Sequence, residues 1–432
     1  MLSKGQSYIT EVLEQIKSKE AKKYVAAELG YHLKETKHAL MKGGLTEEEA
    51  DEKATVQMGS PTKLGMELNR LHRPLVDWFM LTILFATFIF SYLPMLTIPA
   101  VMNGGIIVGN YYIVNKAIII FLGMGVVISL MFFDYRKLRN LQWVFFGLAI
   151  VVLLLPVFMP TTYMLGVPRL KISQVTNQLT IESSMVLPFL YLFWAAFLKN
   201  KHVKLWQAGL IFTVSFFLLQ FLGSPTTLLI YVLMVISMVV WRLRKAAGPL
   251  IGIVVFVSLL GIVQLFSTRG YWLERVVSFM HPERNKDNMY EQVKELMNNA
   301  GLFGNAAKID FLPEPHTDFV FVNFTYHYGW VLAGLLVLLL ALLLVRMVMN
   351  LGKITDPFGS ILIIGGAVIF SVQFIFNIAM TIGLLPMTAM SLPFISYGLM
   401  PTLLNSLIVG LFLSIYRRKD IVLKEEYGNT SV

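Results

Sequence analysis

Carboxylate side chains, which can accept and donate protons, are rare in this sequence beyond residue 70 and gather in one stretch. Fifteen acidic residues follow residue 70, and eight of them lie between residues 267 and 318: Glu274, Glu283, Asp287, Glu291, Glu295, Asp310, Glu314 and Asp318. Glu182, by contrast, is the single acid between Asp134 and Glu274. It stands at the start of an apolar segment, where burial of a carboxylate is costly, so it is a candidate functional residue. Glu182 and Asp318 both precede apolar segments, and helix capping is the alternative explanation for each.

The segments that must position these groups are apolar and long. The chain has 432 residues, of which 56% are hydrophobic and 14% charged, and apolar runs recur from residue 75 almost to the end. A helix needs roughly 20 apolar residues to cross a bilayer, because lipid offers no partner for unpaired backbone groups. We predict an all-α polytopic membrane protein with about ten transmembrane helices, near 75–98, 114–133, 142–159, 183–198, 205–222, 226–241, 249–266, 319–345, 359–380 and 400–416.

The charge distribution predicts how these spans are oriented. The first 70 residues hold 11 basic and 11 acidic residues, so the net charge of +10 lies entirely in the remainder. With a cytoplasmic N-terminus, every predicted cytoplasmic loop is basic, and so is the segment after the last span. Short basic loops are typical of the cytoplasmic side of a membrane protein. This role accounts for the positive charge, so nucleic acid is not an expected partner. We therefore expect a multi-pass protein of the bacterial cell membrane with both termini in the cytoplasm.

Three polar stretches are predicted outside the membrane, near 160–182, 267–318 and 381–399. The third is interrupted by prolines and Ser396, and irregular backbone at membrane depth is tolerated only inside protein or beside a cavity. We interpret it as a re-entrant plug. The chain has no cysteine, which excludes disulfides and thiol chemistry. His, Asp and Glu show no metal-site spacing, and neither a glycine-rich phosphate loop nor a nucleophile elbow is present.

The first 72 residues predict a separate domain of short amphipathic helices in the cytosol. Gly43 and Gly44 can end one helix, Thr46 with Glu49 forms a capping box for the next, and Ser60 with Pro61 begins a third. We expect a transmembrane domain over 73–418, with its large outer loop at 267–318, and a cytosolic tail over 419–432. A solvated helical adaptor is the simplest interpretation of the first domain.

Two long motifs resemble the SEDS family of FtsW, RodA and SpoVE, which polymerise peptidoglycan from lipid II. One is FLPEPHTDFVF at residues 311–321, and the other is GLLPMT at 383–388 followed by LPFISYG at 392–398. Gln373 and Asn377 match the family's pattern in the ninth span. The spacing of Arg169 and Glu182 is also similar. The first domain is similar to small helical prefix domains on membrane proteins of Gram-positive bacteria.

The resemblance implies roles for particular residues. A base must take a proton from the acceptor sugar hydroxyl, and cations must hold the pyrophosphate that leaves. Asp287 is the candidate base, with Glu283 as the fallback and a solvated loop carboxylate as the alternative. Arg169, Glu182 and Arg275 are the candidate substrate-binding residues, although Arg169, Arg275 and nearby Lys171 could be ordinary membrane-edge cations. His316, Asp318 and Ser396 are the candidate site-organising residues, and His327 is expected to pack between helices.

The sequence also departs from the family. Asn285 occupies the position of the family's candidate catalytic aspartate, and Met185 replaces a lysine. Gln220 begins a segment that lacks the family's next aspartate. A non-catalytic scaffold of cell-wall synthesis is therefore one alternative to the enzyme.

The resemblance implies a peptidoglycan glycosyltransferase acting at the outer face in cell division, elongation or sporulation. Its expected partners are lipid II, membrane lipid and a class B penicillin-binding protein transpeptidase. No metal ligand is assigned and no cofactor is expected, with a divalent cation left open. A transporter of a lipid-linked precursor is the second alternative, but it would need a polar path through spans that hold almost no ionisable residues.

Overall fold

In the computed structural model the chain forms two compact units. One comprises Met1–Val76 with Tyr416–Val432, and the other comprises Asp77–Ile415. The structure describes residues 3–72, 74–98, 102–103, 106–158, 161–164, 167–171, 180–199, 204–243, 247–268, 276–281, 289–307, 309 and 312–420.

Four helices form the N-terminal part of the first unit: α1 (Lys4–Glu14), α2 (Lys19–Lys42), α3 (Glu47–Gln57) and α4 (Pro61–Leu71). Their apolar faces meet in a core built on Val12, Ile16 and Val25. The predicted capping box is confirmed, since Thr46 accepts from Glu49 N and the Glu49 carboxylate accepts from Thr46 N. Paired terminal groups of this kind fix where a helix begins.

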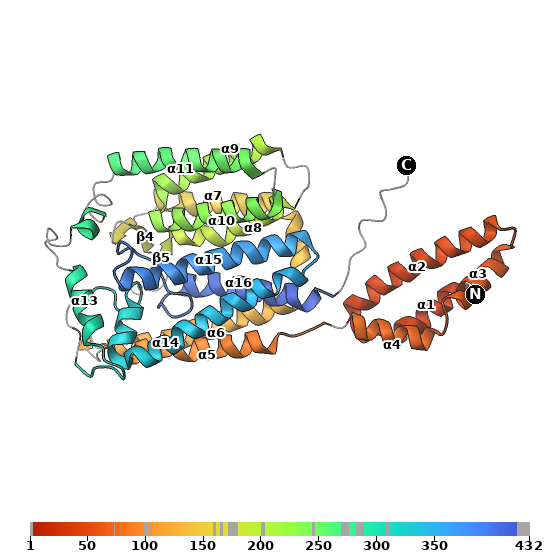
Figure 1. Cartoon of the computed structure of the whole chain (residues 1–432), viewed down its shortest axis with the longest axis horizontal. Coiled ribbons are helices and arrows are strands. Elements are labelled where there is room, and N and C mark those ends of the chain that lie inside the picture. The colour runs from red at the N-terminus through yellow and green to blue at the C-terminus, as the bar shows by residue number, and fades with distance from the viewer. Residues whose placement is uncertain are drawn as a thin grey trace. The chain divides into compact units, whose positions relative to one another are not determined.

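Among the residues that the structure describes, the second unit contains ten apolar helices (Figure 1), the last of which ends in the first unit's segment from Tyr416: α5 (Trp78–Leu96), α6 (Val108–Phe132), α7 (Gln142–Phe158), α8 (Leu187–Leu198), α9 (Leu205–Leu222), α10 (Pro225–Leu243), α11 (Gly248–Thr268), α14 (Val320–Met349), α15 (Pro357–Thr381) and α16 (Leu399–Arg418). Seven are long and apolar enough to cross a membrane. Helices α7, α8 and α11 supply three shorter apolar segments in the part of the chain that the structure describes. The predicted all-α polytopic fold is confirmed.

Helix α15 lies at the centre of this unit. It packs against α8, α10 and α14, while α5 packs against α14 and α6. Polar side chains on its inner face are consequently buried, among them Gln373 and Asn377. Gln373 accepts a 3.0 Å hydrogen bond from Asn405 Nδ2 of α16. Buried amides of this kind need partners, and here they join neighbouring helices.

Short strands and turns occupy the connections. Strands β1 (Met102–Asn103) and β2 (Ile106–Ile107) pair, and β3 (Thr161–Met164), β4 (Val167–Lys171) and β5 (Thr180–Glu182) form a three-stranded antiparallel sheet in that order. The other elements that the structure describes are α13 (Met289–Asn299) and the 3₁₀ turns η1 (Tyr135–Asn140), η2 (Ser183–Val186) and η5 (Leu351–Lys353). The three-stranded sheet lies within the predicted polar stretch 160–182, where no strands were expected.

A break interrupts helix α14 at Gly329, whose φ is 83° and ψ is 169°. The turn over residues 301–305 supplies backbone partners for groups that the break releases. Trp330 N donates to Gly301 O at 3.1 Å, and Val331 N donates to Leu302 O at 3.2 Å. In return, Asn305 N donates to Tyr326 O at 2.7 Å. Residues 301–305 of the 267–318 stretch are therefore docked against the break in α14.

Candidate functional site

The two family-like motifs lie against each other at one end of the helical unit. We call residues 314–318 the outer turn and residues 382–398, between α15 and α16, the C-terminal loop. Ser396 Oγ donates to Thr317 O at 2.7 Å and accepts from Leu392 N at 2.7 Å. Tyr397 N donates to His316 O at 2.7 Å. Ser396 therefore shapes its own loop and attaches it to the outer turn.

Asn377 of α15 also forms hydrogen bonds to both segments. Its Nδ2 donates to Asp318 O at 2.9 Å and to Met390 O at 2.5 Å. Asp318 is buried at 4% exposure and lies before the N-cap of α14, which is Phe319. One side chain on the central helix thus holds both motifs.

The outer turn presents polar and aromatic side chains close together. Thr317 Oγ1 donates to the Glu314 carboxylate at 2.9 Å, and His316 Nε2 lies 3.7 Å from the same carboxylate. The His316 ring is tilted against the Tyr112 ring and lies edge-to-face with the Tyr397 ring, at centroid distances of 4.6 and 5.7 Å. Burial raises the pKa of Tyr397, and the neighbouring tyrosines raise it further. The Tyr397 phenol is therefore held neutral, as a hydrogen-bonding group.

The 267–318 stretch also reaches the C-terminal loop through helix α13. Met387 N donates to Tyr290 Oη at 3.0 Å. Three segments far apart in the sequence therefore converge: the start of α13, the outer turn and the C-terminal loop.

The strand register brings two predicted site residues opposite each other. Arg169 on β4 pairs with Glu182 on β5 in the antiparallel ladder. Residues at paired positions have neighbouring Cα atoms. Their shared role in substrate binding stays a prediction, since the structure describes these two residues at the level of the backbone.

The structure does not describe the residues of the predicted catalytic centre. Asp287, Arg275, Glu283 and Asn285 lie outside the described residues, so their roles also stay predictions. Among the described residues, no three His, Asp or Glu side chains group as metal ligands would.

One residue at this site was missed by the sequence reasoning. Lys116 lies on α6 inside an apolar span and is fully buried. Its Nζ donates to the carbonyl oxygens of Phe394, Ile395 and Ser396 at 2.9, 3.1 and 3.1 Å. A lone cation inside an apolar run was the signal that could have identified it, because such residues are rare and are held by specific partners.

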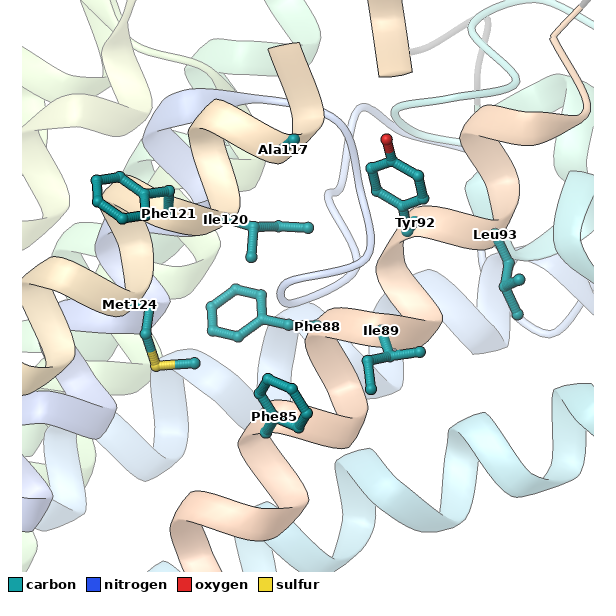
Figure 2. A pocket seen from close by; sticks show the side chains of 9 residues that line it. All are labelled: Phe85, Phe88, Ile89, Tyr92, Leu93, Ala117, Ile120, Phe121 and Met124. Atoms are coloured by element: carbon teal, nitrogen blue, oxygen red, sulfur yellow. The ribbon is translucent and has the colours of Figure 1, made fainter. Parts of the chain in front are cut away.

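An apolar groove lies beside the C-terminal loop, between α5 and α6 (Figure 2). Its cavity volume is about 550 Å³, and its lining side chains are Phe85, Phe88, Ile89, Tyr92, Leu93, Ala117, Ile120, Phe121 and Met124. Figure 2 shows Phe88 projecting from α5 toward Ile120 and Met124 of α6. The Phe88 ring also contacts Phe394 of the loop edge-to-face, at 5.2 Å between centroids. This groove can accept a hydrocarbon chain and is continuous with the loop that Lys116 holds.

Known proteins resemble this chain in sequence and in fold. Residues 77–421 match the family model of FtsW, RodA and SpoVE, described as "Cell cycle protein". The chain is 31% identical to Stage V sporulation protein E of Bacillus subtilis over 182 residues, covering 40% of this chain and 50% of that protein. It is 30% identical to "Probable peptidoglycan glycosyltransferase FtsW" of Dichelobacter nodosus over 250 residues, covering 52% of this chain and 61% of that protein.

Each of these matches therefore spans less than two thirds of the relative. A chain from a solved peptidoglycan synthase complex, which coordinates polymerization and crosslinking, has the same fold. Its TM-score is 0.64 at 20% identity, with 80% of this chain and 98% of that chain covered. The outer turn and the C-terminal loop carry the two family-like motifs, and the described residues form ten apolar helices. With the match over residues 77–421, these features show that this chain belongs to the FtsW, RodA and SpoVE family of membrane proteins.

Proposed function

We propose that this protein is a peptidoglycan glycosyltransferase that polymerises lipid II at the outer face of the bacterial cell membrane. The observation that carries the proposal is the convergence of α13, the outer turn and the C-terminal loop beside an apolar groove. A lipid-linked sugar needs this combination, because its head group reacts in a polar site while its tail stays in hydrocarbon. The groove between α5 and α6 takes part of that tail.

The reaction joins two sugars and releases a lipid pyrophosphate. The acceptor hydroxyl oxygen bonds to the anomeric carbon of the donor as the bond from that carbon to the pyrophosphate oxygen breaks. Asp287 takes the hydroxyl proton, and undecaprenyl pyrophosphate leaves with the electron pair. Arg169 and Arg275 bind the pyrophosphate, because guanidinium groups offer paired donors to phosphate oxygens. A divalent cation at the pyrophosphate is an alternative source of positive charge.

Orientation and partners are part of the proposal. Leu75 N donates to Arg417 O at 3.3 Å, which joins the chain before the first span to the end of the last one. This supports both termini being on one side, and the basic loops favour the cytoplasm. Residues 1–72 then form a cytosolic prefix domain, 73–418 the transmembrane domain and 419–432 a cytosolic tail. A class B penicillin-binding protein is the proposed partner, in line with the synthase complex that shares the fold.

The test is polymerisation of lipid II by the purified full-length protein, with and without a class B transpeptidase. Asp287→Asn removes the base, and Asp310→Asn makes the same change elsewhere in the 267–318 stretch. We expect Asp287→Asn to lower the rate by about 10² to 10⁴-fold, the usual contribution of a general base. Asp310→Asn should retain the wild-type rate. Equal rates for Asp287→Asn and wild type would exclude Asp287 as the base.

A non-catalytic scaffold is the second candidate, and Asn285 at the family's aspartate position favours it. In that case the folded wild-type protein makes no glycan with any partner. It still binds a class B transpeptidase and raises crosslinking by the complex.

A further inference from the structure

Lys116 is a buried cation with a complete set of backbone partners. An ammonium group has three N–H donors, and here the carbonyls of Phe394, Ile395 and Ser396 accept all three within 3.1 Å. An ionised side chain is stable in an apolar interior only when it is compensated in this way. The dependence is mutual, because the three converging carbonyl oxygens would repel one another if the ammonium group did not lie between them.

The backbone held by Lys116 is in an unfavourable conformation. Phe394 has a φ of 64°, in the left-handed region that bulky side chains rarely adopt. Such a conformation persists only where its surroundings determine it. The hydrogen bonds to Lys116 and the packing of Phe394 on Phe88 and Phe370 provide those surroundings.

The loop segment that Lys116 holds contacts two other parts of the site. Toward the outer turn, Ser396 and Tyr397 bond to Thr317 O and His316 O, each at 2.7 Å. Toward the lipid, Phe394 touches Phe88 on the wall of the apolar groove. Lys116 therefore lies where the polar site and the hydrocarbon site meet.

We propose that Lys116 is a positioning residue: it holds residues 394–396 so that the outer turn and the apolar groove keep the relative placement that polymerisation requires. The proposal rests on the proposed function. Lys116 acts through the loop backbone, so its loss should lower kcat more than it raises KM. Displacing a site by about 1 Å can cost on the order of 100-fold in rate.

The main variant is Lys116→Met, which keeps the length of the side chain and removes all three donors. Lys116→Arg keeps the charge and several donors. Lys137→Met makes the same chemical change on an exposed lysine of η1 and is the matched control. If Lys116→Met does not give folded protein, Lys116→Gln, which retains an amide donor, takes its place.

Two measurements are made on each full-length protein in lipid nanodiscs. Hydrogen exchange of a peptide over residues 389–400 reports the loop directly, through amides that include those of Leu392, Ser396 and Tyr397. Initial rates over a range of lipid II concentrations give kcat and KM. We expect Lys116→Met to exchange faster over this peptide and to lose about 100-fold in kcat, with KM within about threefold. Lys116→Arg should recover at least a tenth of the wild-type kcat, and Lys137→Met should match wild type.

Unchanged exchange in Lys116→Met overturns the proposal, because the loop would then not depend on the ammonium group. Faster exchange with unchanged kcat also overturns it, as does a loss that appears only in KM. A wild-type protein that makes no glycan contradicts the proposed function instead. The exchange measurement then still decides whether Lys116 holds the loop.

Discussion

Replacement of Gly329 by alanine should release residues 301–305 from the break in α14. Gly329 combines a φ of 83° with a ψ of 169°, a region that is essentially restricted to glycine. An alanine Cβ there would overlap Leu302 O and Gly304 N, so the docked turn cannot remain in place. The backbone conformation alone costs about 1–3 kcal/mol for a residue other than glycine.

Because the Cβ overlap adds to this backbone strain, we expect the turn to undock, and the hydrogen bonds that undocking breaks give the scale of the effect. Undocking breaks three backbone hydrogen bonds, those of Asn305 N, Trp330 N and Val331 N. At about 1 kcal/mol each, the docked state loses roughly 3 kcal/mol, which corresponds to about 100-fold faster exchange of those amides.

The assay is hydrogen exchange by mass spectrometry on peptides covering residues 299–308 and 325–333. Gly334→Ala is the matched control, because Gly334 lies in the same helix and a Cβ there meets open space. We expect no loss of protection in the control, since alanine favours a helix over glycine. Equal protection of Asn305, Trp330 and Val331 in Gly329→Ala and wild type would refute the docking argument.

Two further predictions concern ionisable groups at helix ends. Arg346→Met should destabilise the protein by about 3–5 kcal/mol, because Asp77 is buried at 3% exposure and its carboxylate loses its 2.8 Å partner. Adding Asp77→Asn should recover part of the loss in a thermal unfolding scan, and no recovery would argue against an unpaired charge as the cause. In the N-terminal unit, hydrogen bonds from Thr46 lower the pKa of Glu49, so the capping box stabilises α3 above the usual carboxyl pKa. This stabilisation should fade as pH drops through the folded-state pKa of Glu49, and Glu49→Gln should reduce the resulting pH dependence of the protection factors at the start of α3.

The sequence predicted the membrane fold well, because span length follows from bilayer thickness and from the need to pair backbone groups. It also named His316, Asp318 and Ser396 as site-organising residues, because two long motifs carry them. The structure joins these motifs through Thr317 O and His316 O, and the role of the three residues stays a prediction.

What could not be predicted depends on contacts between distant backbone groups. Lys116 is held by carbonyls 278 to 280 residues away, and carbonyls leave no pattern in a sequence. The break at Gly329 depends on the turn that docks into it, whereas a single glycine in a long apolar run predicts an unbroken helix. The strands at 161–182 are too short to show an alternating pattern. For this reason the pairing of Arg169 with Glu182 appeared only in the structure.

The central claim is that this chain polymerises lipid II. The measurement that tests it most directly is incubation of the purified full-length protein with lipid II and a class B transpeptidase, followed by separation of the glycan chains on a gel. We expect a ladder of polymer that is lost in Asp287→Asn and kept in Asp310→Asn. A well-folded wild-type protein that binds the transpeptidase but yields no polymer would contradict the account and leave the protein a scaffold.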